Sequence, residues 1–423
     1  MQLHTRTLKN GLKLLTIPMA NTETVTVMVL VGTGSHYEIR KNVGISHFLE
    51  HMFFKGTKKY PDPITLNKQL DAIGAQHNAF TSMEETGYYV KCHKDHFDLA
   101  LGFVSDILQN SLIPAGEITK EKNVILEEMK MRKDNPRIHI WDMFGSVMFG
   151  DQSAGWDTIG TEETLSAVTR KSLVDYWNTH YTSENAMVIV SGNVADEETM
   201  KKVERAFTKL RRGKKQKRTS TSARVKAPNI RVLPRETDQV HFMLGFSGFA
   251  YEDKDKLASE VLATILGGYM SSRLFDRIRE RLGLAYSIRA WHESFPQHGY
   301  FAIYAGVPQG KEEKALSETL DELSTVAKKG VSKEEFARAI EHFKGSLAIG
   351  LEATDDVAHY VGGQMLYAGK VLLPEAVAKK LDTITRADIQ RVAKKMFSAK
   401  NAYMTLTGQN IDEKKMRALL KHM

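Results

Sequence analysis

The chain of 423 residues contains a single cysteine, Cys92. One cysteine excludes an internal disulfide and fits a reducing compartment, and we expect Cys92 to be a small buried residue rather than a catalytic thiol. No stretch approaches the roughly 18 uninterrupted apolar residues of a membrane span. The first residues, Met1 to Arg6, lack the basic and then apolar layout of a signal peptide. These absences predict a cytoplasmic protein with no membrane span.

Acidic residues are missing from the stretch that carries the excess positive charge. The net charge is +8, and the run from Arg211 to Lys226 holds eight basic residues and no acid. A basic run can bind nucleic acid or an anionic membrane. This one has no aromatic residue to stack on bases, which disfavours a nucleic-acid partner. We therefore expect a solvated linker, placed at 211–229.

The second half of the chain repeats the first at an offset of 216 residues, from Thr169 to Thr385. The segment TRKSLVDYWNTHYTSENAMVIVSGN aligns there without a gap with TRADIQRVAKKMFSAKNAYMTLTGQ. Thr24–Gly32 aligns in the same way with Val240–Gly248. Copies of about 200 residues predict two homologous domains rather than a solenoid. We place them at 1–210 and 230–423.

Hydrophobic periodicity predicts an α+β fold for each half. In the first half, strands are expected at 12–17, 24–31, 79–81, 86–92 and 187–191, and helices at 43–55, 65–73, 97–108, 115–133 and 170–181. Because the strands are both paired and separated by helices, we expect a mostly antiparallel sheet with helices packed on one face.

The segment VGISHFLEHMFFKGT, residues 43–57, carries a candidate metal motif. His47 and His51 are four residues apart on the expected helix, so both imidazoles lie on one face. Zinc favours such neutral nitrogen donors, and a catalytic zinc site uses three protein ligands and a water. Glu50 can face that water as a general base without being a ligand. The alternative is a buried amphipathic helix with incidental histidines, but two histidines and a glutamate are costly to bury unpaired.

The expected helix EITKEKNVILEEMKMRKD offers a third ligand. Glu121 and Glu128 are seven residues apart and share a face, whereas Glu127 is rotated away by about 100°. This spacing allows Glu128 to bind the metal and Glu121 to orient a ligand or a substrate group. We expect Glu127 to belong to an exposed face paired with neighbouring lysines.

With these residues in place, the chain resembles the inverzincin metallopeptidases, the family of pitrilysin, insulin-degrading enzyme and the mitochondrial processing peptidase. The resemblance extends to GAQHNAFTSMEETGYYV, EKNVILEEMKM and SSRLFDRIRERLGLAY, and thus to essentially the whole chain. It implies a zinc-dependent endopeptidase of the short, processing-peptidase-like branch, with one zinc ion per chain. The residues that it matches are the zinc ligands His47, His51 and Glu128, the general base Glu50, the second acid Glu121, the substrate strand Asn78-Ala79-Phe80-Thr81, and the substrate-binding Arg279 and Tyr286.

The second half departs from the metal motif. The offset of 216 places Ala263, Leu266 and Gly267 at the positions of His47, Glu50 and His51. Only the first half can therefore hold the ion. Some pairs in the family divide the metal motif and the Arg/Tyr motif between two subunits; this chain has both, which favours a homodimer over a heterodimer. The competing hypothesis is a non-catalytic structural or peptide-binding subunit, and a third is a maturation protease for one precursor. The substrate and its cleavage preference do not follow from the sequence.

Overall fold

The computed structural model describes residues 1–219, 221 and 225–421. The chain forms two compact units, which are described separately. Unit 1 comprises Met1–Lys130, Trp156–Ser220 and Ile349–Val371, and unit 2 comprises Met131–Gly155, Thr221–Ala348 and Leu372–Met423. Each unit thus includes one short segment from the other half of the sequence.

The strands, in chain order, are β1 His4–Thr7, β2 Lys13–Pro18, β3 Thr24–Val31, β4 Gln76–Thr81, β5 Thr86–His93, β6 Ala186–Gly192, β7 Asn229–Pro234, β8 Gln239–Ser247, β9 Ser287–Ser294, β10 Gly299–Pro308 and β11 Ala402–Gly408. The helices are α1 Ile45–Met52, α2 Pro63–Asp71, α3 Phe97–Asn110, α4 Ala115–Asp134, α5 Pro136–Phe149, α6 Glu162–Ala167, α7 Arg170–His180, α8 Asp196–Ala206, α9 Lys256–Gly267, α10 Glu312–Lys329, α11 Lys333–Ile349, α12 Thr354–Ala368, α13 Pro374–Leu381, α14 Arg386–Met396 and α15 Glu413–Lys421, with a π-helix at Phe275–Arg281.

In the part of the chain that the structure describes, five strands follow the same order in the two sheets, and the sheet of unit 1 has one further strand, β1. In the described residues, the sheet of unit 1 runs β1-β2-β6-β3-β5-β4 and that of unit 2 runs β7-β11-β8-β10-β9. In each sheet one pair is parallel, β2 with β6 and β7 with β11, and the other pairs are antiparallel. Strands β4 and β9 are therefore equivalent edge strands. The expected α+β fold, with two homologous and mostly antiparallel sheets, is confirmed.

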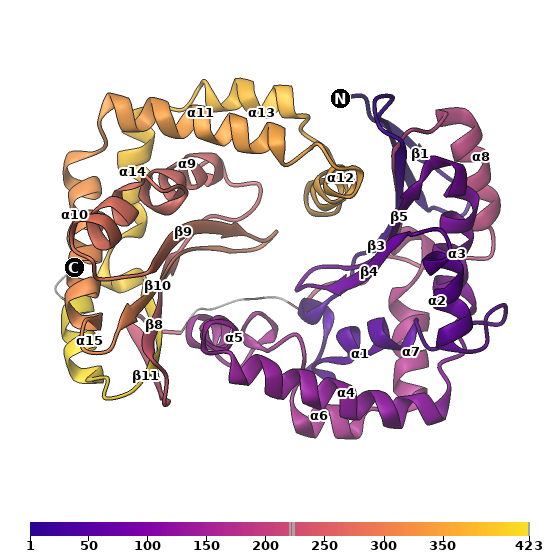
Figure 1. Cartoon of the computed structure of the whole chain (residues 1–423), viewed down its shortest axis with the longest axis horizontal. Helices are drawn as coiled ribbons and strands as arrows, with labels where there is room; N and C mark the ends of the chain where they lie inside the picture. The colour runs from indigo at the N-terminus through magenta and orange to yellow at the C-terminus, as the bar shows by residue number, and fades with distance from the viewer. Residues whose placement is uncertain (220, 222–224, 422–423) are drawn as a thin grey trace. The chain divides into compact units, whose positions relative to one another are not determined.

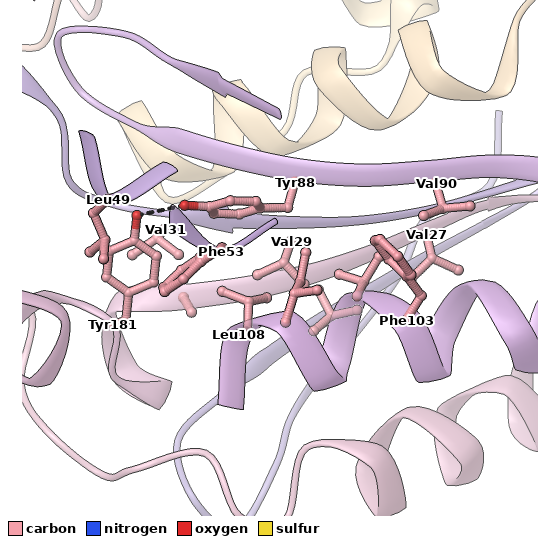
Figure 2. Close-up of a cluster of buried hydrophobic side chains, with 14 of the residues drawn as sticks. Val27, Val29, Val31, Leu49, Phe53, Tyr88, Val90, Phe103, Leu108 and Tyr181 are labelled. Atoms are coloured by element: carbon pink, nitrogen blue, oxygen red, sulfur yellow. Dashed lines mark hydrogen bonds between the residues drawn. The ribbon is translucent and has the colours of Figure 1, made fainter. Parts of the chain in front are cut away.

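The main core of unit 1 lies between one face of its sheet and the helices α1, α3 and α7. Figure 2 shows part of this core, where Leu49 and Phe53 from the α1 segment meet Tyr88 and Tyr181. The two tyrosine hydroxyls form a hydrogen bond of 2.9 Å. The Phe53 ring packs against both tyrosine rings, with centroids 5.3 Å from Tyr88 and 5.1 Å from Tyr181. The core therefore holds α1 beside β4 and β5.

A helix also covers the second face of each sheet, which the expectation of helices on one face did not include. In unit 1 this helix is α12 (Figure 1). Its Val357 and Val361 pack in one cluster with Met28 and Leu30 of β3. In unit 2 the equivalent helix is α5, which packs against β7, β8 and β11. Strand β3, TVTVMVLV, is apolar on both faces, so a sheet covered on one side only would leave Met28 and Leu30 exposed.

The first part of the basic run at 211–229 is attached to unit 1 at several points, although most of its basic side chains are exposed to solvent. Thr219 donates its backbone N–H to the His36 carbonyl, and Arg218 lies 3.5 Å from the buried Glu84 carboxylate. Glu84 also contacts His36 at 2.9 Å. A buried carboxylate needs a cationic or hydrogen-bonding partner, which explains why this segment is held against the surface. Residues 220 and 222–224, including Arg224, lie outside the described residues.

Candidate metal centre

Helix α1 begins without a local capping side chain. Gly44 precedes it at φ 91°, a left-handed conformation, and a Cβ there would lie 2.6 Å from the Ile159 carbonyl oxygen. Only glycine fits this position. The buried Glu38 carboxylate caps the helix instead, accepting from the N–H groups of Gly44 at 2.8 Å and Ser46 at 2.9 Å. Burial raises the pKa of Glu38 to about 7, although these two hydrogen bonds oppose the rise.

The two histidines project from α1 onto one side. Their Nε2 atoms are 3.3 Å apart, and their ring centroids are 4.6 Å apart. Phe48, Leu49 and Met52 point the other way and are fully buried. The core thus orients α1 so that both imidazoles face the same small space.

Glu128 of α4 completes a set of three donors. Its Oε2 atom lies 3.7 Å from Nε2 of His47 and 3.7 Å from Nε2 of His51. In the described part of the chain, these are the three residues that form a group suited to a metal ion. Two donors at about 2.0–2.1 Å from a tetrahedral zinc ion lie about 3.3–3.4 Å apart. The three separations of 3.3, 3.7 and 3.7 Å therefore fit one zinc ion with a fourth position left for water.

Glu121, two turns before Glu128 on the same face of α4, supports His51. Its Oε1 lies 2.8 Å from Nδ1 of His51 and its Oε2 lies 2.6 Å from Nζ of Lys55. The carboxylate is 3% exposed; burial alone would raise its pKa, but the hydrogen bonds from His51 and Lys55 hold the pKa below its usual value. An ionised carboxylate only accepts hydrogen bonds, so Nδ1 of His51 donates and Nε2 keeps its lone pair free.

The Glu50 carboxylate faces strand β4, whereas the Glu121 carboxylate contacts His51. The Thr81 hydroxyl, at the end of β4, donates to Oε2 of Glu50 at 2.5 Å. Burial raises the pKa of Glu50, the Thr81 and His51 interactions oppose the rise, and the Glu128 charge adds to it. The carboxylate is thereby a better proton acceptor than an exposed glutamate.

The expected substrate strand Asn78-Ala79-Phe80-Thr81 is the second part of β4, at the edge of the sheet. Its Phe80 ring packs on His359 of α12, with ring centroids 4.8 Å apart. Gly87 of β5 makes room for this ring, because a Cβ there would lie 2.2 Å from it. Glu127, as expected, is exposed and pairs with Lys130 at 2.7 Å.

Arg279 and Tyr286 belong to unit 2, whereas the three donors belong to unit 1. The structure brings these two residues to each other: the Arg279 guanidinium lies 5.3 Å from the centre of the Tyr286 ring. The guanidinium also lies 4.5 Å from the Phe275 ring. Tyr286 is 75% exposed, so its hydroxyl is free to meet a ligand.

Sequence reasoning missed Glu38 and Lys55 as supports of the site. The signal for Glu38 was the glycine at the N-cap position of α1, because a helix start without a capping side chain needs another acceptor. Lys55 lies four residues beyond His51 and past the end of α1 at Met52; within the expected helix 43–55, the spacing of four would have placed it beside His51.

Comparison with known proteins identifies the family. Residues 13–162 match the model of "Insulinase (Peptidase family M16)", and residues 167–343 match that of the "Peptidase M16 inactive domain". A protein of Rickettsia bellii described as an uncharacterized zinc protease is 34% identical over 404 residues, which cover 95% of this chain and 97% of that protein. The Bacillus subtilis zinc protease YmxG, also described as uncharacterized, is 35% identical over 393 residues, with 93% and 95% covered. The chain belongs to peptidase family M16, the pitrilysin family of metallopeptidases, whose relatives are named zinc proteases.

Solved structures share the fold. A protease from Helicobacter pylori superposes with a TM-score of 0.89 at 23% identity, covering 96% of this chain and 99% of that one. A Pseudomonas fluorescens structure described as a peptidase M16 inactive domain superposes equally well, with a TM-score of 0.89 at 18% identity and coverage of 97% and 98%. Within the described residues, none of the helices has the length and apolar character needed to cross a bilayer.

Proposed function

We propose that this chain is a zinc-dependent endopeptidase that cuts peptides or unfolded protein segments. The observation that carries the proposal is the convergence of the His47, His51 and Glu128 donor atoms within 3.7 Å of one another. Such a triad, with one open position, is typical of catalytic rather than structural zinc sites. The second half has Ala263 and Gly267 at the histidine positions, so the proposal is one zinc ion per chain.

The side chains around the triad supply the remaining chemistry. Zinc, when bound, supplies a Lewis acid that lowers the pKa of a coordinated water to about 7. Glu50 accepts the proton of the attacking water, and Thr81 fixes its carboxylate for that role. Glu121 holds His51 in the tautomer and ring orientation that metal binding requires, so it is a positioning residue.

The edge strand and the second unit define the expected substrate contacts. One edge of β4 has no strand partner among the described residues, so an extended peptide can pair with Asn78–Thr81 through its backbone. Backbone pairing gives affinity with little demand on sequence, which favours unfolded substrates. Arg279 and Tyr286 are suited to donate hydrogen bonds to a carbonyl oxygen as it gains negative charge.

We infer that the protein forms a homodimer and that it acts in the cytoplasm. The chain carries both the metal motif and the Arg279/Tyr286 pair, so a dimer needs no second kind of subunit. Its one cysteine, Cys92, is buried and unpaired, which fits a reducing compartment. Light scattering on the purified chain tests the dimer directly.

The competing function is a non-catalytic, peptide-binding subunit. The match of residues 167–343 to a domain described as inactive is the observation in its favour. The complete set of metal donors and Glu50 in the first half argues against it, because a purely structural subunit has no need of a free metal position.

The test combines metal analysis with cleavage of a quenched fluorescent peptide library. We expect the wild type to hold about one zinc ion per chain and to cut, and Glu50→Gln to hold zinc but lose at least about 10²–10⁴-fold in rate. Glu128→Gln is expected to lose the zinc. Glu127→Gln is the matched control, because it changes the neighbouring, exposed glutamate and leaves the donors intact.

Two outcomes would contradict the proposal. Equal zinc content in Glu128→Gln and Glu127→Gln would remove Glu128 from the ligand set. If the wild type and Glu50→Gln both hold zinc and neither cuts any peptide, the non-catalytic subunit becomes the better hypothesis.

A further inference from the structure

Unit 2 contains a cavity of about 590 Å³ that lies along edge strand β9. Its wall is formed by α5, the end of α9 with the loop that follows, the π-helix, β9 and β10. The lining residues that matter here are Arg137 and Trp141 of α5, Gly267 of α9, Arg289 and Trp291 of β9, and Tyr304 of β10.

The cavity is bordered by two elements of unit 2 that correspond to elements beside the metal centre of unit 1. Helix α9 corresponds to α1, because each follows the equivalent strand in its half of the repeat. Edge strand β9 corresponds to β4 by the shared strand order. At the offset of 216 residues, Gly267 aligns in the sequence with His51. A Cβ on Gly267 would lie 2.3 Å from the backbone nitrogen of Ala290 in β9. The end of α9 thus packs directly on β9 through a glycine.

The cavity is cationic. Arg137, Arg279 and Arg289 line it, and no aspartate or glutamate does. Arg279 has an acidic neighbour, Glu280, at 3.6 Å. Arg137 and Arg289 make no ion pair with any residue in the described ranges; the Arg137 guanidinium instead lies 5.2 Å from the centre of the Tyr304 ring. Two arginines therefore remain available to a carboxylate ligand.

The cavity also has a flat aromatic wall. Trp141 of α5 and Trp291 of β9 stack with ring centroids 4.5 Å apart and an interplanar angle of 4°. Trp141 is 46% exposed, so part of its surface is open to a ligand. Arg289 is placed two residues before Trp291 on the same face of β9, because side chains of a strand alternate. The positive charge of Arg289 and the aromatic surface of Trp291 thus lie side by side along β9.

These features fit an extended, acidic peptide segment. Strand β9 pairs only with β10 in the described sheet, so its outer edge can accept a further strand. A strand added there would place alternate side chains toward Arg289 and Trp291. We propose that this cavity binds an acidic segment of the peptide substrate without cutting it, since the cluster of metal donors is absent from its lining. The identification of the bound peptide as a substrate rests on the proposed peptidase function, whereas the binding of an acidic peptide does not.

The experiment measures binding apart from cleavage. The full chain with Glu50→Gln is titrated against two labelled decapeptides, one with four glutamates and one with glutamines in their place, and anisotropy is recorded. We expect the acidic peptide to bind more tightly. Replacing Arg137 and Arg289 together with alanine should weaken its binding by about five- to tenfold per arginine and leave the neutral peptide unchanged.

Three controls make the result specific. Arg205→Ala removes an exposed arginine of unit 1 and should change nothing. Arg137→Lys with Arg289→Lys keeps the charge and should recover part of the affinity, and thermal denaturation shows that each variant is folded. Addition of the acidic peptide should change the tryptophan emission of the Glu50→Gln parent and should leave that of the Trp141→Leu variant unchanged.

The inference is overturned if the double alanine variant binds the acidic peptide as the parent does, or if both peptides bind equally. If free glutamate competed as strongly as the acidic peptide does, the conclusion that the ligand is a peptide would be wrong. Loss of acidic-peptide binding in the double variant, with a wild type that cuts nothing, would support the cavity and refute the proposed peptidase function.

Discussion

Replacement of Glu121 by glutamine tests whether the buried carboxylate tunes the metal site through His51. Glu121 touches Nδ1 of His51 at 2.8 Å and Lys55 at 2.6 Å. The glutamine amide can keep a hydrogen bond to Nδ1, but it can no longer place a full negative charge behind the imidazole. Substitution of such a supporting carboxylate costs about 10–100-fold in metal affinity, or about 1.4–2.7 kcal/mol.

The assay is competition for zinc against a chelator of known affinity at pH 7. Glu121→Gln should release zinc at a chelator concentration about 10–100-fold lower than the wild type does. Glu117→Gln is the control, because Glu117 lies one turn earlier on α4 and pairs with Lys120 at 2.6 Å, away from His51. Equal zinc retention by Glu121→Gln and the wild type would refute the reasoning, since the geometry leaves Glu121 no other route to the metal.

Two further predictions concern buried groups away from the metal donors. Burial, with a smaller contribution from the Glu84 charge, raises the pKa of Glu85 to about 7. Between the usual pKa of about 4.5 and 7 the folded state binds more protons than the unfolded state, so stability falls as pH rises through this window. Glu85→Gln should therefore raise the melting temperature at pH 8, by an amount that corresponds to about 1–3 kcal/mol, and should have no effect near pH 4.5; equal melting temperatures at pH 8 would contradict this. Burial also raises the pKa of the Cys92 thiol to about 11, so a thiol reagent at pH 8 should label the native chain far more slowly than the denatured chain, and rapid native labelling would show that the strand opens.

Much of the candidate site follows from residue spacing alone. The separation of four residues between His47 and His51 places both Nε2 atoms in one space, as the helix period requires. The separation of seven between Glu121 and Glu128 places both carboxylates on the face of α4 that meets α1. Local periodicity determines which side chains share a helical face, so these relations are visible in a sequence.

The packing partners of α5 and α12 do not follow from local pattern. Each helix packs in the unit whose sheet is formed by the other half of the sequence. Periodicity shows that a helix has an apolar face, but not which sheet that face will cover. The apolar run at 27–31 within β3 did signal a second covered face; it could not identify α12 as the cover. Likewise, Glu38 lies six residues before Gly44, and only the folded loop brings its carboxylate to the start of α1.

Close packing at Gly267 distinguishes the second half of the chain from the first. At the offset of 216 residues this glycine aligns with His51, whose imidazole in the first half contacts Glu121 and lies near Glu128 of α4. In the second half, α9 has closed on β9 until a Cβ at 267 would meet backbone at 2.3 Å. Restoring a histidine there would force helix and strand apart, at the expense of buried contacts with Ile265 and Leu266. Close packing therefore excludes a metal-binding side chain at position 267, and the cavity beside it is lined instead by Arg289 and Trp291 of β9.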